Sequence, residues 1–200
     1  MMVLKDYVRL LENNRQDDYN ATLQPLIENL ISFWVDDYSE MTSHDTEIVE
    51  FKNAGFSFLF DLAKSSSETF IAGETKEARV VVAYGVTQKN SALRDKSRLQ
   101  GFIGGFEGIP RYEGYDKGHF ISHKIGGMLD QNLFPQKKET NRGWSEEGKK
   151  FRDIERFCER NEGIFMFSRP LYTNASWIPS EVEIGYLAKD FTFVIENVSN

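Results

Sequence analysis

Residues 115–144 read YDKGHFISHKIGGMLDQNLFPQKKETNRGW, and residues 151–160 read FRDIERFCER. Eight glycines fall between residues 101 and 127, so loops and tight turns that display functional groups are expected there. The later segment places Phe151, Ile154, Phe157 and Cys158 on one face of a helix, with charges on the other. Three polar motifs, YDKGH, NLFPQ and NRGW, therefore precede an amphipathic helix.

A second helix is predicted near the N-terminus. Six apolar residues from Leu23 to Trp34 recur at the spacing of one helix face, and Pro25 is expected in the first turn. The polar run from Ser65 to Gly73 is typical of a surface loop. A boundary is predicted between residues 64 and 77.

Strands are predicted where β-branched and aromatic residues gather between turn residues. Phe56, Phe58, Phe60 and Leu62 alternate in a way that fits either a half-buried strand or a crowded core helix, and both remain open. The clearer strand candidates cover residues 78–86, 164–167, 182–187 and 191–195.

The charge distribution along the chain is uneven. The net charge of −7 combines 24 Lys and Arg with 31 Asp and Glu. Residues 1–77 hold 6 basic and 15 acidic side chains (net −9), residues 78–160 hold 16 and 11 (net +5), and residues 161–200 hold 2 and 5 (net −3). The middle of the chain could therefore meet a polyanion locally, although the whole protein is acidic.

Composition excludes several classes of protein. The single cysteine, Cys158, cannot form an internal disulfide or a cysteine-based zinc site. Residues 1–14 carry Asp6, Arg9 and Glu12 among their apolar residues, and nowhere do 18 apolar residues run together, so neither a secretory signal nor a membrane span is predicted. The expected location is the cytoplasm by default, or outside the cell by an export route that needs no signal peptide.

The ordered motifs together resemble the DNA/RNA non-specific endonucleases of the ββα-metal class, in the His-Me finger superfamily. That family has Asp-Arg-Gly-His, then Asn-x-x-Pro-Gln, then Asn-x-Gly before a helix that carries a glutamate. The resemblance covers residues 78–195 and implies an α+β fold: a ββα-metal nuclease domain with a central antiparallel sheet and an N-terminal helical elaboration. The division expected is an acidic, mainly helical region at 1–70 and a nuclease domain at 71–200.

The resemblance also implies site residues. Hydrolysis of a phosphodiester needs a base for water, a cation for the charge that builds on the phosphate, and support for the leaving oxygen. His119 matches the general base, and an imidazole with an ordinary pKa of about 6.5 suits that task. Asn141 matches the metal ligand and Glu155 the helix glutamate close to the metal. The implied ion is Mg²⁺, or Mn²⁺ in its place, because hard cations prefer oxygen ligands.

Three further residues, Asp116, Asn132 and Gln136, are expected to organise the loops around the site. Lys117 stands where the family has arginine, so it keeps the charge but loses the planar fork that grips phosphate. Arg142 and Arg169 are expected to contact phosphate and to take over that arginine's role, and Lys117 and Arg142 count with His119 and Glu155 as catalytic candidates.

Some assignments stay open at this point. Asn132 and Asn141 could exchange roles, and Glu146 and Glu147 are rival carboxylates to Glu155, which could instead be an exposed helix residue paired with Arg152. GFIGG at 101–105 is expected to form a turn beside the site, because the helix start that a dinucleotide site needs does not follow it.

The function predicted is metal-dependent, sequence-independent endonucleolytic cleavage of DNA, extended to RNA. The alternative is a catalytically inactive nucleic-acid-binding or interaction module on the same fold. A free nuclease would harm its own cell, so a bacterial toxin or effector role with an immunity or inhibitor protein is considered, without a membrane partner. The first 77 residues would then be a partner-binding or export module, or a helical elaboration packed on the sheet.

Overall fold

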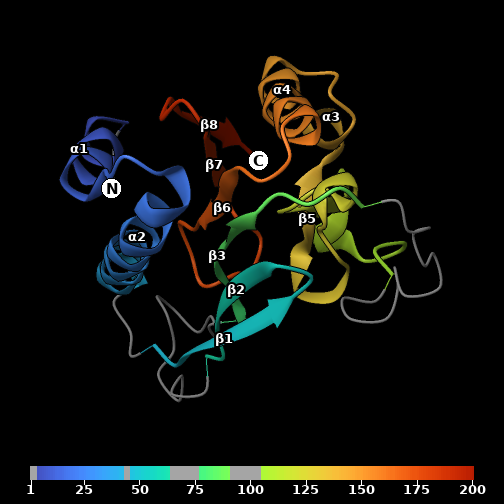
Figure 1. Ribbon diagram of the computed structural model, residues 1–200. Helices are drawn as coiled ribbons and strands as arrows, with labels where there is room; N and C mark the ends of the chain where they lie inside the picture. Colours follow the sequence, from blue (N-terminus) through green and yellow to red (C-terminus); the bar gives the residue numbers. More distant parts are fainter. Residues whose placement is uncertain (1–3, 43–45, 64–76, 91–104) are drawn as a thin grey trace.

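A six-stranded antiparallel sheet lies at the centre of the computed structural model, which describes residues 4–42, 46–63, 77–90 and 105–200 (Figure 1). Its strands follow the order β1-β2-β3-β6-β7-β8. Their bounds are β1 Ile48–Asn53, β2 Phe56–Asp61, β3 Arg79–Val86, β6 Phe165–Leu171, β7 Glu181–Leu187 and β8 Phe193–Ser199. The predicted α+β class with a central antiparallel sheet is confirmed, and each of the four clear strand candidates overlaps an observed strand.

Two helices, α1 (Leu4–Asn14) and α2 (Tyr19–Thr42), cover one face of this sheet. The carboxylate of Asp18 accepts the backbone N–H of Ala21 at 2.7 Å and caps α2. The helix therefore begins four residues before Leu23. Pro25 lies in the second turn of the helix and not in the first turn, as was predicted, and in the second turn it removes one helical hydrogen bond. Among the described residues, the helices do not combine the length and apolar composition needed to cross a bilayer.

The opposite face of the sheet carries a two-stranded hairpin and two helices (Figure 1). The hairpin consists of β4 (Tyr115–His119) and β5 (Leu133–Lys137), and α3 (Lys138–Asn141) and α4 (Glu146–Arg160) follow it directly. Three short 3-10 turns accompany the hairpin. The turn η3 (Pro110–Tyr112) precedes it, and η4 (His123–Ile125) and η5 (Asp130–Asn132) lie in the connection between its two strands. The chain order is thus strand, strand, helix, as the motifs predict.

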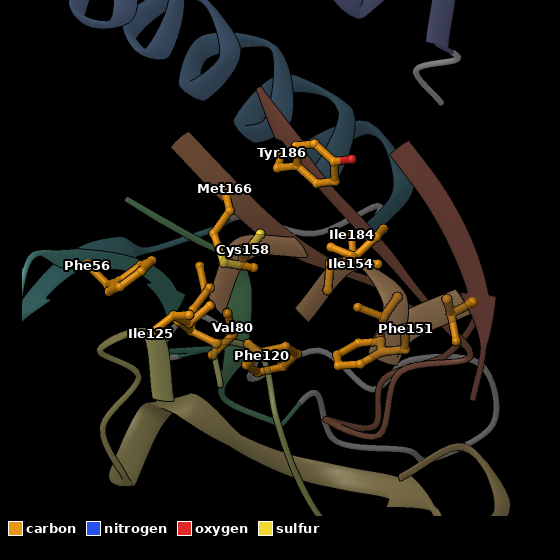
Figure 2. Close-up of a cluster of buried hydrophobic side chains, with 14 of the residues drawn as sticks. Phe56, Val80, Phe120, Ile125, Phe151, Ile154, Cys158, Met166, Ile184 and Tyr186 are labelled. Carbon is orange, nitrogen blue, oxygen red and sulfur yellow. The ribbon is translucent and has the colours of Figure 1, made fainter. Parts of the chain in front are cut away.

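A shared apolar core fixes the hairpin and α4 on the sheet (Figure 2). Burial of each large apolar side chain contributes about 1.5–3 kcal/mol, so this core holds the polar motifs in a defined position. The side chains that form it include Phe56, Val80, Phe120, Ile125, Phe151, Ile154, Cys158, Met166, Ile184 and Tyr186.

The sheet crosses the domain boundary predicted at residue 70. Residues 56–61, left open between strand and helix, form β2, and β2 pairs with β3 from Phe56 opposite Gly85 to Asp61 opposite Arg79. The N-terminal region therefore supplies two strands of the sheet as well as two helices. The boundary was predicted from loop composition and from the change of charge sign, and both are properties of the surface and not of the shared core. Residues 64–76 lie outside the described residues.

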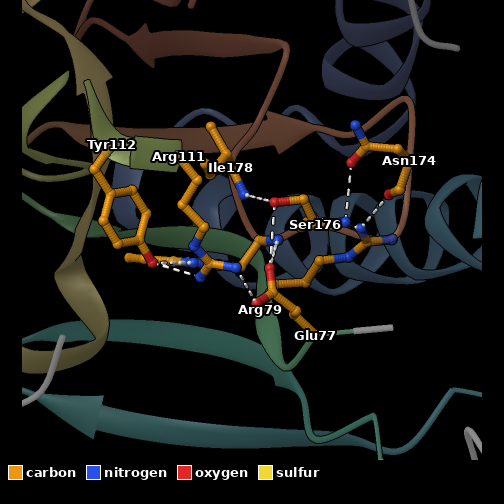
Figure 3. A network of polar contacts seen from close by, with 8 residues as sticks. Glu77, Arg79, Arg111, Tyr112, Asn174, Ser176 and Ile178 are labelled. Atoms are coloured by element: carbon orange, nitrogen blue, oxygen red, sulfur yellow. Dashed lines mark hydrogen bonds and ion pairs between the residues drawn. The ribbon is translucent and has the colours of Figure 1, made fainter. Parts of the chain in front are cut away.

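A polar network fastens the segment after β6 to the start of β3 (Figure 3). The Glu77 carboxylate accepts hydrogen bonds from Ser176 Oγ and the Trp177 backbone N–H, and forms an ion pair with Arg111 at 2.7 Å. Arg79, which is 2% exposed, donates to the backbone carbonyls of Asn174 and Ser176. This network holds η3 near the hairpin that carries the YDKGH motif.

Candidate active site

The YDKGH motif is strand β4, and its partner strand β5 contains the end of NLFPQ. In the antiparallel register Asp116 lies opposite Gln136 and Gly118 opposite Phe134. Because side chains alternate along a strand, Asp116 and Gly118 project to one face of the hairpin, and Lys117 and His119 to the other. The hairpin thus presents two different polar surfaces.

Gly118 is required by a close contact with Gln136. A Cβ at position 118 would lie 2.3 Å from Gln136 Oε1 and 2.5 Å from its Cβ. The Gln136 side chain is buried, at 2% exposure, and so has little room to move. The glycine before the histidine is therefore explained by packing, and Gln136 braces the strand that ends at His119.

Substitution of Gly118 by alanine is expected to destabilise the protein by about 1–3 kcal/mol, because the added methyl group overlaps a buried side chain. The free energy of unfolding in urea measures this effect. Gly105→Ala is the matched control, since a Cβ at Gly105 meets no heavy atom within 4 Å. Equal stability of the two variants would show that Gln136 does not confine the strand.

Asn132 holds the loop between the two strands. Its Oδ1 accepts the Ile121 backbone N–H at 2.8 Å, while Nδ2 donates to the carbonyls of Ile121 (2.7 Å) and Met128 (2.6 Å). The residue is 1% exposed. Both ends of this amide are engaged with the backbone, so its arrangement suits bracing. Asn141, which is half-buried, is the less buried of the two asparagines.

The side chains of Asn141 and Arg142 both contact the carboxylate of Asp116, which lies 25 and 26 residues earlier in the sequence. Arg142 binds the carboxylate through two atoms, Nε to Oδ2 at 2.8 Å and Nη2 to Oδ1 at 3.2 Å. Nδ2 of Asn141 lies 3.4 Å from the same Oδ2. Because the amide nitrogen faces Asp116, the carbonyl oxygen of Asn141 is directed to the other side, where it can accept a cation.

The turn that carries Asn141 is fitted closely to α4. Ser145 Oγ accepts the Gly148 N–H at 3.0 Å and caps the helix, which therefore begins at Glu146 and not at Phe151. A Cβ at Gly148 would lie 2.5 Å from the Thr140 carbonyl oxygen, and one at Gly143 would lie 2.5 Å from Arg152 Nε. One flank of α4 thus faces the turn.

Glu155 belongs to this flank. It lies three residues after Arg152 and seven after Gly148, spacings that place all three positions on the same side of a helix. Glu155 is half-buried. The rival carboxylates behave differently: Glu146 and Glu147 stand in the first turn of α4 and form ion pairs with Lys149 and Lys150. Of the three, Glu155 is therefore the one on the flank that α4 turns towards Asn141.

Arg152 is a cation that the sequence analysis did not count among the site residues. Its side chain is half-buried against Gly143, next to Asn141 and Arg142. Within the part of the chain that the structure describes, no hydrogen bond or ion pair engages its guanidinium. The sequence could have indicated this role, because Arg152 lies three residues before Glu155 and this spacing places both residues on one flank of the helix.

Lys117 and His119 are half-buried on the other surface of β4. Lys117 Nζ lies 5.6 Å from the centre of the Phe106 ring, and burial lowers the pKa of this amine below its ordinary value. His119 ends the strand, and its Nε2 is shielded from solvent. His119 lies three positions after Asp116, about 10 Å along the strand, and projects to the opposite face of the hairpin.

A cleft of about 570 Å³ opens beside this site. Tyr115, Asp116, Lys138 and Arg142 line one side of it, and residues 106–110 line another. The cleft therefore reaches the Asp116–Arg142 pair directly. Its lining carries two basic side chains, Lys138 and Arg142, and three carboxylates, Glu107, Glu113 and Asp116. The remainder of the GFIGG motif, residues 101–104, lies outside the described residues.

Arg169 does not contact phosphate at this site, contrary to the prediction from the sequence. It lies on β6, on the same strand face as Phe165 and Phe167, which pack against α1 and α2. Its side chain is 2% exposed and binds Asp37 at 2.7 Å and Glu183 at 3.0 Å. The sheet separates this buried ion-pair cluster from the hairpin.

No family model matches the sequence, and no curated protein matches it. Similar solved structures include NucA from Streptococcus agalactiae with a magnesium ion bound, which has 14% identity and a TM-score of 0.40 over 82% of this chain and 88% of that one. The Sda1 nuclease with a bound zinc ion has 14% identity and a TM-score of 0.40 over 78% of this chain and 74% of that one.

Proposed function

We propose that this protein is a metal-dependent nuclease that hydrolyses phosphodiester bonds of DNA and RNA without sequence preference, as the motif resemblance to the ββα-metal endonucleases implies. The contact of Asn141 and Arg142 with Asp116 carries the proposal. It joins the Asp116 face of the YDKGH strand to the NRGW turn, which is far from it in sequence, beside a cleft.

The residues of this surface fit a hard divalent cation. Asn141 offers its carbonyl oxygen and Glu155 offers a carboxylate, and oxygen donors of this kind suit Mg²⁺ or Mn²⁺. Among the described residues, no three His, Cys, Asp or Glu side chains gather into a metal-binding group. A site of few protein ligands agrees with Mg²⁺, which keeps several waters and takes further ligands from a phosphate. Such a cation would neutralise charge on the phosphate and support the leaving oxygen.

The chain's own residues supply the remaining chemistry. His119 takes a proton from the attacking water, the role that the motif resemblance implies for it. Asp116 fixes the guanidinium of Arg142, which then presents its remaining N–H donors to a phosphate oxygen. Arg152 takes the phosphate contact that the sequence analysis gave to Arg169, because its guanidinium lies against the NRGW turn. Contacts of this kind carry no base information, which explains cleavage without sequence preference.

Asn141→Ala is expected to raise the Mg²⁺ concentration needed for half-maximal cleavage of supercoiled plasmid by at least about tenfold. The purified protein should nick plasmid and degrade a folded RNA in Mg²⁺ and do neither in EDTA. Asn29→Ala, an exposed asparagine on α2, is the matched control and should leave the Mg²⁺ dependence unchanged.

Absence of cleavage by folded protein in both Mg²⁺ and Mn²⁺ would contradict the nuclease proposal and favour a binding module on the same fold. Cleavage that persists in EDTA would remove the cation from the reaction. If the nuclease is confirmed, we further propose that the producing cell restrains it with an inhibitor or immunity protein, or exports it as a toxin.

A further inference from the structure

Trp144 is the most exposed large apolar side chain in the described part of the chain. Its side chain is 66% exposed, whereas Trp34 is fully buried and Trp177 is half-buried. Burial of apolar surface is favourable by roughly 25 cal/mol per Å², so an indole left exposed to water forgoes this free energy. Single exposed apolar side chains are common on protein surfaces, so the surroundings of Trp144 decide whether it serves a ligand.

The backbone of Trp144 is fixed on both sides. Its N–H donates to the Glu139 carbonyl at 2.8 Å, and the next residue, Ser145, caps α4. Gly143 before it has φ of +66°, and its Cα packs on the Arg152 side chain. The indole is thus displayed from a rigid turn and not from a loose loop.

One face of the indole is covered by Arg142. The Arg142 guanidinium carbon lies 5.0 Å from the ring centre, and Asp116 holds the same guanidinium through two hydrogen bonds. Since two thirds of the side chain remains exposed, the opposite face of the ring is open to solvent. Asp116, Arg142 and Trp144 therefore form a stack with one free aromatic face.

We propose that the free face of Trp144 is a stacking platform for an unpaired nucleobase, so that the site prefers single-stranded DNA or RNA to duplex. This inference deepens the proposed nuclease function and depends on it for its biological meaning. Aromatic side chains that stand beside cationic residues stack on bases of single strands without reading their sequence. In a duplex the faces of a base are already covered by its neighbours, so the platform gains nothing there.

The surroundings of Trp144 favour a nucleobase over an apolar protein partner. Its neighbours in sequence, Arg142, Ser145 and Glu146, are polar or charged. Of the five other exposed large apolar side chains of the described residues, four lie on α1, α2 and β1, and one, Ile109, lines the cleft that Arg142 also lines. A protein-docking surface is a contiguous apolar patch, which a single ring among charges is not. Arg142 also lines the cleft with Lys138, so a strand whose base lies on Trp144 can place its phosphates near both cations.

Binding of oligonucleotides in EDTA tests this proposal without any need for cleavage. We expect an eight-residue deoxyadenylate strand to quench the fluorescence of Trp144, and an abasic strand of the same length and charge to bind about tenfold more weakly. Trp144→Ala should remove that tenfold difference, Trp144→Phe should keep most of it, and duplex binding should not change. Phe51→Ala, an exposed aromatic on β1, is the matched control.

Equal affinities of the wild-type protein for the adenylate and abasic strands would overturn the proposal. So would a loss of duplex and single-strand binding by the same factor in Trp144→Ala, because the ring would then support the backbone contacts and not a base. Base-dependent binding together with a failure to cleave in Mg²⁺ or Mn²⁺ would uphold the platform while refuting the nuclease proposal, so the two failures are distinguishable.

Discussion

Replacement of His119 by alanine is expected to slow cleavage of supercoiled plasmid by about 10²- to 10⁴-fold, the usual contribution of a general base. The expectation follows from its place at the end of β4, on the strand that also carries Asp116. Because His119 is half-buried and Gly118 and Gln136 confine the strand, its ring is held in position before substrate binds. The rate under saturating Mg²⁺, measured beside the melting temperature, separates lost chemistry from lost folding.

His123→Ala is the matched control, since this second histidine lies four residues further on, in η4, and contacts the Gly127 carbonyl through its ring. It should retain most of the activity. Imidazole added to a His119→Gly variant is expected to restore part of the rate, because it supplies the missing base in solution. Full activity of His119→Ala, or a loss of equal size in His123→Ala, would remove His119 from the base role.

The parts of the fold that the sequence predicts are those with a local pattern. Residues 78–86 are β-branched because β3 is buried on both faces, and the amphipathic face of residues 151–160 faces the core that holds α4. The ordered motifs likewise place Asn132 and Gln136 beside the YDKGH strand. Helix starts were predicted late because the caps, Asp18 and Ser145, precede the apolar pattern.

Long-range partners could not be predicted in this way. Arg169 looked available for phosphate because its partners, Asp37 and Glu183, lie 132 and 14 residues away and share no motif with it. A signal was present in the strand itself: FMFSRPL is apolar on both sides of the arginine, and a charge inside such a strand is buried with a counter-charge. The role of Arg152 and the exposure of Trp144 depend on how tightly the turn packs on α4, which sequence spacing does not report.

The buried pairing of Arg169 has a large expected effect on stability. Asp37 on α2 and Glu183 on β7 both bind its guanidinium, and the Tyr7 hydroxyl of α1 also donates to Glu183. The cluster thereby ties both N-terminal helices to the middle of the sheet. Removal of the arginine takes the cation from Glu183, which is 1% exposed, and one partner from Asp37, which is 7% exposed.

Arg169→Met is accordingly expected to lower the free energy of unfolding by about 3–5 kcal/mol, which is a large share of the 5–15 kcal/mol typical of a domain. Lys124→Met, which breaks the exposed Lys124–Glu159 pair, should cost less than about 1 kcal/mol. Urea unfolding at pH 7 measures both. If Arg169→Met does not fold, Arg169→Lys keeps the charge but loses the fork, and its smaller deficit can be measured instead.

The deficit of Arg169→Met should also depend on pH, in a direction set by Glu183. Burial already raises the pKa of this carboxyl, despite Arg169 beside it, and loss of the arginine raises it further. The variant therefore carries its largest penalty at neutral pH, where burial of an unpaired carboxylate is most costly, and the penalty shrinks as the pH falls and Glu183 takes up a proton. Arg169→Met combined with Glu183→Gln should recover part of the stability at pH 7 and lose most of the pH dependence. A deficit that grows on acidification would show that Asp37, and not Glu183, is the carboxylate that Arg169 chiefly compensates.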